Sequence, residues 1–293
     1  MEPTFPLLRL PENALIEVLK NMRLKELLEF SYVSTKTQNV VTSLRIKADD
    51  VNITIYDSNE IALHMYRSNL GFRPSTLNDF RNNLNYIRTI FSRTSPPNVR
   101  FYADCERHEI ELLKEIIGNV NILYVASTVT DALSREILKH FNTPNRLYLG
   151  SNPFEDTCQV QQIFIQNHNI IEFDGDYSLD DMLLINSEKV RFIRFSTQKT
   201  INQFLKHWIR GSNPRMQRMD IPLNKDDFAN GETYLKGIRY IELSDETKIE
   251  IRQEHSLSVD ADMIQIRRED GTPAVIATNE RDQQRNIHLI VLH

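Results

Sequence analysis

Short strand-like triplets recur along the chain at a nearly constant spacing, and this period constrains the fold more than any other feature. The triplets begin at positions 99, 123, 147, 171, 193, 219 and 241, so that each follows the last by 22 to 26 residues. A fixed period in the twenties indicates small repeated units that bury their apolar sides against one another. The triplets read Val99-Arg-Phe101, Leu123-Tyr-Val125, Leu147-Tyr-Leu149, Ile171-Glu-Phe173, Ile193-Arg-Phe195, Met219-Asp-Ile221 and Ile241-Glu-Leu243.

Apolar residues at helical spacing lie between the triplets. One strand and one helix per repeat are typical of leucine-rich-type repeats, but the asparagine of that pattern is mostly absent, so we expect a degenerate α/β version. The clearest helical stripe includes Trp208, which we interpret as a core residue and not as a recognition aromatic. The stripes consist of Ile110, Leu113, Ile116 and Ile117, of Leu133, Ile137, Leu138 and Phe141, and of Ile201, Phe204, Leu205, Trp208 and Ile209.

Other segments lie outside the period. Residues 46–66 alternate apolar and polar side chains around Asp57-Ser58-Asn59, which predicts a hairpin, and residues 76–93 read as one longer helix. Beyond residue 244 we expect antiparallel strands that cap the open end of the stack. These strands are residues 247–252, 263–268 and 274–278, with a turn at Asp270-Gly271, and a last strand at residues 288–292.

The first 44 residues carry more aliphatic side chains than so short a segment can bury. Three short helices are predicted, and the first has an apolar stripe of Leu15, Ile16, Leu19 and Met22. A segment of about 40 residues is near the lower limit for a core of its own. Two interpretations stay open: the surplus apolar surface meets a partner protein, or it packs onto the rest of the same chain.

The order of residues in this segment resembles the F-box family. The resemblance rests on Leu8-Arg-Leu10-Pro11 and the helix after it, on Leu24-Lys-Glu-Leu-Leu28 and on Tyr32-Val-Ser34, although many F-boxes carry a Trp where this chain has Thr37. F-boxes dock onto the adaptor of SCF-type ubiquitin ligases, and through it onto a cullin. The adaptor-binding residues that the resemblance implies are Leu8, Leu10, Pro11, Ile16, Leu19, Leu24, Leu27 and Val33.

A second resemblance lies in the repeat region. The phrase Asn202-Gln-Phe-Leu-Lys-His-Trp-Ile-Arg-Gly-Ser-Asn-Pro214 is similar to the type 2 F-box-associated regions of a divergent F-box family expanded in nematodes. Such regions are thought to recruit substrates, which implies that the repeats bind a target protein. We divide the chain into an F-box at 1–44, a hairpin and helical connector at 45–95, a leucine-rich-repeat-like F-box-associated domain at 96–244 and a C-terminal β cap at 245–293.

The middle residue of each triplet points out from the sheet, because successive residues of a strand face opposite sides. Tyrosine and arginine, which are enriched at interface hot spots, recur in this row. The row therefore indicates a target-binding surface, and the competing interpretation is a solvated surface or one covered by the C-terminal strands. Its members are Arg100, Tyr124, Tyr148, Glu172, Arg194, Asp220 and Glu242.

Composition argues against several classes of function. With 40 acidic and 35 basic residues the net charge is −5, which disfavours nucleic acid as a partner. Only two cysteines occur, the first residues lack the apolar core of a signal peptide, and no apolar run approaches the length of a membrane span. These features indicate a reducing intracellular location, in the cytoplasm, the nucleus or both. We expect no membrane association, cofactor or metal ion.

Two clusters resemble catalytic or metal-binding motifs. Residues 174–185 resemble a calcium loop, but Leu179 and Ile185 stand where glycine and a carboxylate are needed, so a loop or helix cap is the better interpretation. Cys105 lies three residues before His108, a spacing that suits a thiolate–imidazole contact. The sequence offers no group to orient that pair.

These observations favour a substrate receptor of an SCF-type ubiquitin ligase that carries out no chemistry itself. Such a protein brings the lysines of its target close to the ubiquitin-loaded subunits. The alternative is a repeat-type scaffold whose N-terminal helices merely cap the stack. A third hypothesis is a cysteine-dependent hydrolase that acts through Cys105.

Overall fold

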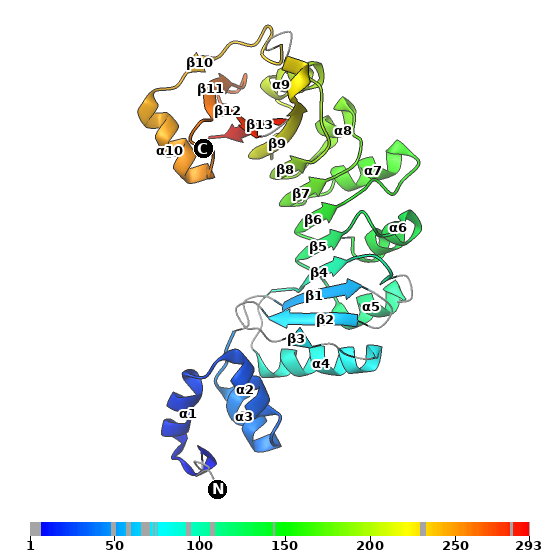
Figure 1. Cartoon of the computed structure of the whole chain (residues 1–293), viewed down its shortest axis with the longest axis vertical. Coiled ribbons are helices and arrows are strands. Elements are labelled where there is room, and N and C mark those ends of the chain that lie inside the picture. Colours follow the sequence, from blue (N-terminus) through cyan, green and yellow to red (C-terminus); the bar gives the residue numbers. More distant parts are fainter. Residues whose placement is uncertain are drawn as a thin grey trace. The chain divides into compact units, whose positions relative to one another are not determined.

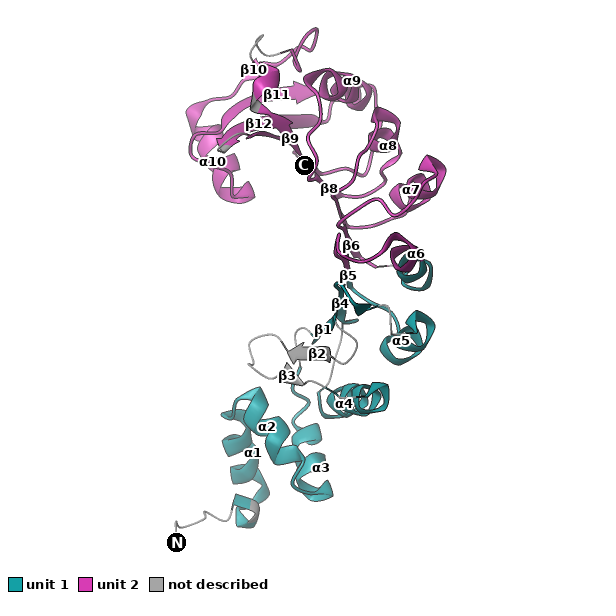
Figure 2. Ribbon diagram, turned by 45° about the vertical axis from the view of Figure 1, so that its right-hand side comes forward, with its two compact units in different colours: residues 1–123, 136–142 teal, residues 124–135, 143–293 magenta. Residues whose placement is uncertain are grey.

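The structure is a computed structural model (Figure 1), and in it the chain forms two compact units (Figure 2). Unit 1 contains residues 1–123 and 136–142, and unit 2 contains residues 124–135 and 143–293. No helix in the described part of the chain is long and apolar enough to cross a membrane. The structure describes residues 7–47, 51–56, 60–65, 71–72, 74, 76–91, 95–105, 109–142, 144–228, 233–281 and 284–292.

Unit 1 begins with short helices that share a small aliphatic core. Ser34 begins the third α-helix: its Oγ accepts a hydrogen bond from the Thr37 backbone, and the Thr37 side chain accepts one from the Ser34 backbone. The helices are η1 (Leu7–Arg9), α1 (Glu12–Lys20), α2 (Leu24–Ser31) and α3 (Thr35–Ser43). The buried aliphatic residues are Leu15, Leu19, Leu27, Leu28 and Val41.

The rest of unit 1 combines a hairpin with the first strand and helices of the stack. The antiparallel pairing of β1 and β2, up to Tyr56↔Glu60, confirms the predicted hairpin, and its turn at residues 57–59 lies outside the described residues. Thr76 caps α4, and β4 pairs in parallel with β1. The elements are β1 (Val51–Tyr56), β2 (Glu60–Met65), β3 (Gly71–Phe72), α4 (Leu77–Ile90), β4 (Asn98–Phe101) and α5 (Ile110–Ile117).

Strands and helices alternate through the first part of unit 2, as the period predicts. The strands β6 to β9 are parallel, and in each the middle residue of the triplet is less buried than its neighbours. The helices α7, α8 and α9 cover one face of these strands (Figure 1). The chain enters unit 2 within β5 (Ile122–Val125), and α6 (Asp131–His140) is divided between the units. The further elements are β6 (Arg146–Leu149), α7 (Thr157–Phe164), β7 (Ile170–Phe173), α8 (Leu179–Leu184), β8 (Lys189–Phe192), α9 (Gln198–Ile209), β9 (Arg218–Asn224) and η3 (Lys225–Phe228).

Backbone hydrogen bonds join the turn that follows each strand to the end of the strand in the preceding repeat. The amides of Gly150, Asp174 and Ile193 donate to the carbonyls of Val125, Leu149 and Phe173, at 2.8, 2.9 and 3.0 Å. The turns approach so closely that a Cβ on Gly150 would lie 2.4 Å from the backbone nitrogen of Ser127. These contacts stack the repeats without the asparagine that the leucine-rich pattern carries.

One predicted strand is displaced by three residues. The fifth triplet is Val190-Arg191-Phe192 within β8, so the assignment of Ile193-Arg194-Phe195 to a strand is wrong. The two triplets show the same alternation of apolar and basic residues, and the pattern alone could not distinguish them. The preceding helix, α8, has only 6 residues, and β8 therefore begins earlier than the period predicts. Accordingly, Val190 and Phe192 are buried, whereas Ile193 and Phe195 are exposed.

A second predicted strand, residues 247–252, is a helix. Ser244 caps α10 (Asp245–His255) by accepting a hydrogen bond from the Thr247 amide, and two carboxylates in the first turn favour the helix dipole. The apparent alternation came from Ile249 and Ile251, of which only Ile251 is buried. The short strand β10 (Ile241–Glu242) pairs antiparallel with β11 (Asp262–Arg267), so the last triplet does not continue the parallel stack.

The C-terminal strands continue the sheet of unit 2 beyond β9. β13 pairs antiparallel with β9 from Gln284↔Asn224 to Ile290↔Arg218, so the edge of the parallel stack is covered, as expected of a cap. The expected turn contains Gly271 with a φ of 95°. The strands are β11 (Asp262–Arg267), β12 (Pro273–Arg281) and β13 (Gln284–Val291).

Arg268 joins this C-terminal sheet to α9. Its guanidinium lies 4.8 Å from the centre of the Trp208 ring, and it donates hydrogen bonds to the carbonyls of Trp208 and Ser212. The Glu269 amide donates to the Ile209 carbonyl at 2.8 Å. Trp208 is fully buried, which confirms its interpretation as a core residue.

Candidate functional site

The adaptor contacts implied by the F-box resemblance differ widely in exposure. Leu19 and Leu27 are fully buried among the N-terminal helices, so both stabilise the fold itself. The side chain of Leu8 lies outside the described residues. The remaining contacts are all accessible in whole or in part. They are Leu10, Ile16 and Leu24, which are half-buried, and Pro11 and Val33, which are exposed.

An exposed apolar stripe runs along α1. Pro11, Ala14 and Val18 are exposed and follow one another at helical spacing, on the flank of α1 next to its buried leucines. Val18 is 39% exposed. The sequence reasoning missed Ala14 and Val18 because it followed the stronger stripe, which is the core. The spacing of positions 11, 14 and 18 was the signal that could have revealed them.

Thr37 occupies the position where many F-boxes carry a Trp. Its side chain is buried and belongs to the capping box with Ser34. In this chain the position therefore stabilises the start of α3 and offers no aromatic contact to a partner.

Aromatic and polar contacts attach the N-terminal helices to α4. The rings of Tyr32 and Tyr86 stack with centroids 4.3 Å apart and planes 7° apart. The Tyr86 hydroxyl donates to Ser31 Oγ at 2.9 Å, and Ser31 Oγ donates to the Leu28 carbonyl. Burial, assisted by the neighbouring Tyr86, raises the pKa of Tyr32. The N-terminal helices are thus fixed to the next element of unit 1.

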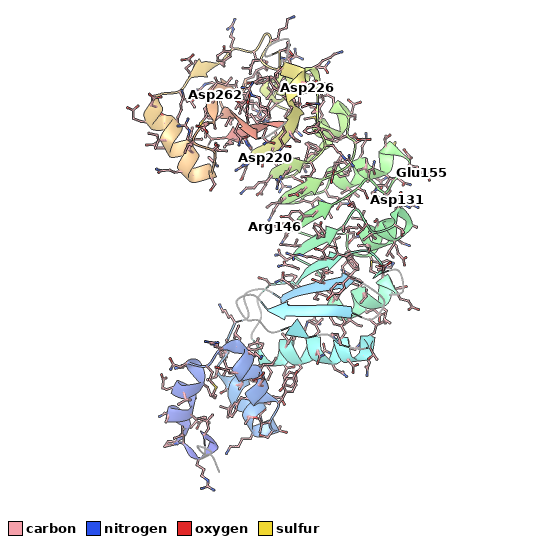
Figure 3. All side chains as sticks on the ribbon, viewed as in Figure 1. Asp131, Arg146, Glu155, Asp220, Asp226 and Asp262 are labelled. Carbon is pink, nitrogen blue, oxygen red and sulfur yellow. The ribbon has the colours of Figure 1, made fainter. Side chains whose placement is uncertain are left out.

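Four residues of the predicted target-binding row lie on one face of unit 2. Tyr124, Tyr148, Glu172 and Asp220 project from the side of the strands opposite α7, α8 and α9, which we call the open strand face. The Tyr124 and Tyr148 rings are 6.2 Å apart. In Figure 3, Arg146 and Asp220 are on this side of unit 2, and Glu155 is on the helix side.

Arg191 completes this row between Glu172 and Asp220. It is in register with both, and its guanidinium lies 3.5 Å from a Glu172 carboxylate oxygen. Sequence reasoning placed Arg194 here because it assigned the wrong triplet to β8. Arg194 instead follows the strand and pairs with Asp174 at 3.0 Å.

The two outer members of the predicted row do not belong to the open strand face of unit 2. Arg100 is exposed on β4 of unit 1, and Glu242 is exposed on β10, where it is in register with Ile264 of β11. The structure therefore does not bring Glu242 beside the parallel strands of the open strand face.

His288 extends the row onto β13. Its Nδ1 lies 2.7 Å from Asp220 Oδ1, and its Nε2 lies 3.2 Å from Asn279 Oδ1. Burial alone would raise the pKa of Asp220, but the hydrogen bond and charge of His288, together with Arg218, lower it. Sequence reasoning missed His288 because the pairing of β13 with β9 gives no signal in the local pattern.

The C-terminal end of α10 stands over the open strand face. Ile251 packs in a cluster with Met263, Val275 and Ala277, and Ala277 is in register with His288, so α10 covers the face that carries the row. Figures 1 and 2 show α10 on the side opposite α7 to α9. A cavity of about 370 Å³ lies between this end of α10 and β8, β9 and β13, and Asp220 and His288 line it.

The structure also places the residues of the other candidate chemistries. The Asp181 carboxylate accepts hydrogen bonds from the Ser178 amide and hydroxyl, which confirms the helix-cap interpretation of residues 174–185. Cys105 is fully buried, a poor position for a nucleophile, and His108 lies outside the described residues. Among the described residues, no group of three or more His, Cys, Asp and Glu side chains could hold a metal ion.

Comparisons with known protein families match two segments of the chain. Residues 7–49 match the model of the F-box domain, and residues 159–221 match the F-box associated model. The first match spans the N-terminal helices, and the second runs from α7 to β9. No curated protein and no solved structure shows a significant match to the chain. The nematode-expanded branch of the family stays a prediction. The chain therefore contains an F-box domain, and the region behind it is similar to the F-box-associated family.

Proposed function

We propose that the protein is the substrate-recognition subunit of an SCF-type ubiquitin ligase. F-box domains bind the adaptor within SCF complexes, and the pairing with an F-box-associated region suggests a substrate receptor in general. In this proposal the N-terminal helices bind the adaptor, and through it a cullin, and the open strand face binds the target. The other subunits transfer ubiquitin, and the chain needs no cofactor. An intracellular location, in the cytoplasm, the nucleus or both, is part of the proposal.

The observation that carries the adaptor half is the exposed stripe of α1 within the matched F-box. Pro11, Ala14 and Val18 are exposed, and the half-buried Leu10 and Ile16 come from the same short segment. Burying an aliphatic side chain contributes about 1.5–3 kcal/mol, whereas association costs about 4–15 kcal/mol. The group as a whole can offset that cost, and no single residue can.

The scaffold alternative has one observation in its favour. The Tyr32–Tyr86 stack and the Tyr86–Ser31 hydrogen bond attach the N-terminal helices to α4, as expected of a cap. A cap, however, has no use for an exposed apolar stripe. Co-purification of the adaptor therefore distinguishes the two functions.

The test uses a matched pair of exposed valines. We expect Val18→Asp to abolish co-purification of the SCF adaptor with the full-length protein, because a carboxylate would be desolvated in the contact. Val259, in unit 2, is 79% exposed, and Val259→Asp should leave adaptor binding unchanged. Circular dichroism would verify that both variants fold. Adaptor retained equally by both, or absent from the wild-type sample, would contradict the proposal.

A further inference from the structure

Basic side chains concentrate on the open strand face of unit 2, although the chain as a whole has a net charge of −5. Lys189 and Arg191 are two positions apart on β8 and therefore project from the same side. Lys189 is in register with Arg218 on β9. Arg146, at the start of β6, is labelled on the same side in Figure 3. Two acidic residues, Glu172 and Asp220, oppose these four cations.

Two of these four cations, Arg146 and Lys189, are available to a ligand. Arg218 pairs with Asp220 at 2.9 Å, and Arg191 lies near Glu172 with its own side chain still 59% exposed. Arg146 and Lys189 are exposed and have no ion pair or hydrogen bond from their side chains within the described part of the chain. The open strand face therefore has positive charge that the protein does not neutralise itself.

The end of α10 turns this charged face into a groove. Arg218 Nη1 donates to the His255 carbonyl at 3.2 Å, which holds the last turn of α10 against β9. Two adjoining cavities, of about 370 and 610 Å³, share Arg218 and Ser256 in their walls; Arg191 lines the first and Lys189 the second. Burial lowers the pKa of His255, and the charges of Arg218 and Lys189 lower it further against the opposing charge of Glu254. Arg218, which lines both cavities, and Lys189 therefore bring two cations to the place where the cavities meet.

We propose that this basic groove, formed by Lys189, Arg191 and Arg218 beneath the end of α10, binds acidic side chains of an extended segment of the target protein. The proposal rests on the proposed function and specifies the chemistry of the target. Lys189 and Arg191 are about 6.6 Å apart along the strand, the distance between alternate side chains of an extended peptide. The rim also includes Ile193 and Leu257, which can pack against the aliphatic parts of such a segment.

Nucleic acid fits the groove less well. Glu172 and Asp220 alternate with the cations across neighbouring strands, and Glu254 lies at the wall. A continuous phosphate backbone would meet these carboxylates, whereas separate carboxylates of a peptide can contact the cations between them. The alternation therefore favours a peptide with spaced acidic residues.

The test measures binding of a fluorescein-labelled peptide of ten residues, alternating Glu and Ala, to the full-length protein by fluorescence anisotropy. A matched Gln–Ala peptide should bind at least tenfold more weakly. Each of Lys189→Gln and Arg191→Gln should weaken binding of the Glu peptide about threefold, and the double variant about tenfold. Lys199→Gln, which makes the same change on an exposed residue of α9, should have no effect.

Equal binding of the Glu and Gln peptides, or an unaltered affinity in the double variant, would overturn the proposal. A single-stranded oligonucleotide that binds more tightly than the Glu peptide, and loses affinity in the same variants, would also overturn it. Adaptor co-purification with the double variant distinguishes failure of the basic-groove proposal from failure of the proposed receptor function. Adaptor binding with no peptide discrimination rejects the groove alone, whereas absence of the adaptor from wild type and variant rejects the receptor function.

Discussion

The N-terminal helices and the strand–helix stack bury their apolar residues in different ways. In the helices, neighbours along the chain divide between core and surface, so Leu19 is fully buried while Val18 is 39% exposed. In the stack, strict alternation buries Val190 and Phe192 and leaves Arg191 on the open strand face. A strand pattern therefore identifies the surface side chains once the strand is located. A short helix with apolar residues around most of its circumference does not reveal which of them are available to a partner.

The largest expected effect would test the division between core and surface in α1. Leu19→Ala should lower the free energy of unfolding by about 2–5 kcal/mol, because it opens a cavity in a small core. Val18→Ala, one position earlier and exposed, should change it by less than about 0.5 kcal/mol. Urea denaturation followed by circular dichroism measures both values. Equal losses in the two variants would mean that α1 does not have the described orientation.

The second-largest expected effect concerns the stack, where the Arg268 side chain joins the C-terminal sheet to α9. Arg268→Met should lower the free energy of unfolding by about 2 kcal/mol, because the carbonyls of Trp208 and Ser212 lose their charged donor. Arg267→Met is the matched control, since Arg267 is exposed and, within the described part of the chain, its side chain donates a hydrogen bond only to the Gly271 carbonyl of its own turn. Differential scanning calorimetry would compare the two variants. A control as destabilised as Arg268→Met would refute this role of the guanidinium.

The smallest effect is a pH dependence on the open strand face. Because the pKa of Asp220 is lowered below its usual 3.8, the carboxylate stabilises the folded protein at neutral pH, and this contribution is lost as the pH falls through the folded-state pKa. Asp220→Asn should therefore be less stable than wild type at pH 7, by under about 1 kcal/mol. The difference should begin to shrink as the pH falls below about 4 and should vanish below the folded-state pKa of Asp220. Asp226→Asn, on the exposed η3, should follow the wild-type curve, and a difference for Asp220→Asn that does not depend on pH would exclude the ionised carboxylate as its cause.

Periodicity predicted most of the elements, and local capping explains where it failed. The triplets at positions 147, 171 and 219 lie in parallel strands as expected. The triplet at 193 was misplaced because α8 is short and two similar triplets are adjacent. Residues 247–252 form part of a helix because Ser244 and the acids after it favour a helix start more strongly than two isoleucines favour a strand.

The candidate site was less accessible to sequence reasoning than the fold. Tyr124, Tyr148, Glu172 and Asp220 could be placed on one face from alternation alone. His288 could not, because its position beside Asp220 depends on the register of β13 against β9, across 68 residues of chain. The end of α10 was equally invisible, since its packing over Ala277 is a tertiary contact. The alternation of residues in a strand predicts which side chains share a face of the sheet, but it does not predict that α10 packs over that face and forms a groove.

The joint between α2 and α4 also limits motion. Tilting one stacked ring against the other loses the stacked geometry, whereas sliding within the plane keeps the rings parallel. Here the Tyr86 hydroxyl is held by Ser31, and Ser31 is itself held by the Leu28 carbonyl, so the sliding motion is restrained as well. A movement of the three N-terminal helices against α4 would therefore have to break the ring stack or the Tyr86–Ser31 hydrogen bond.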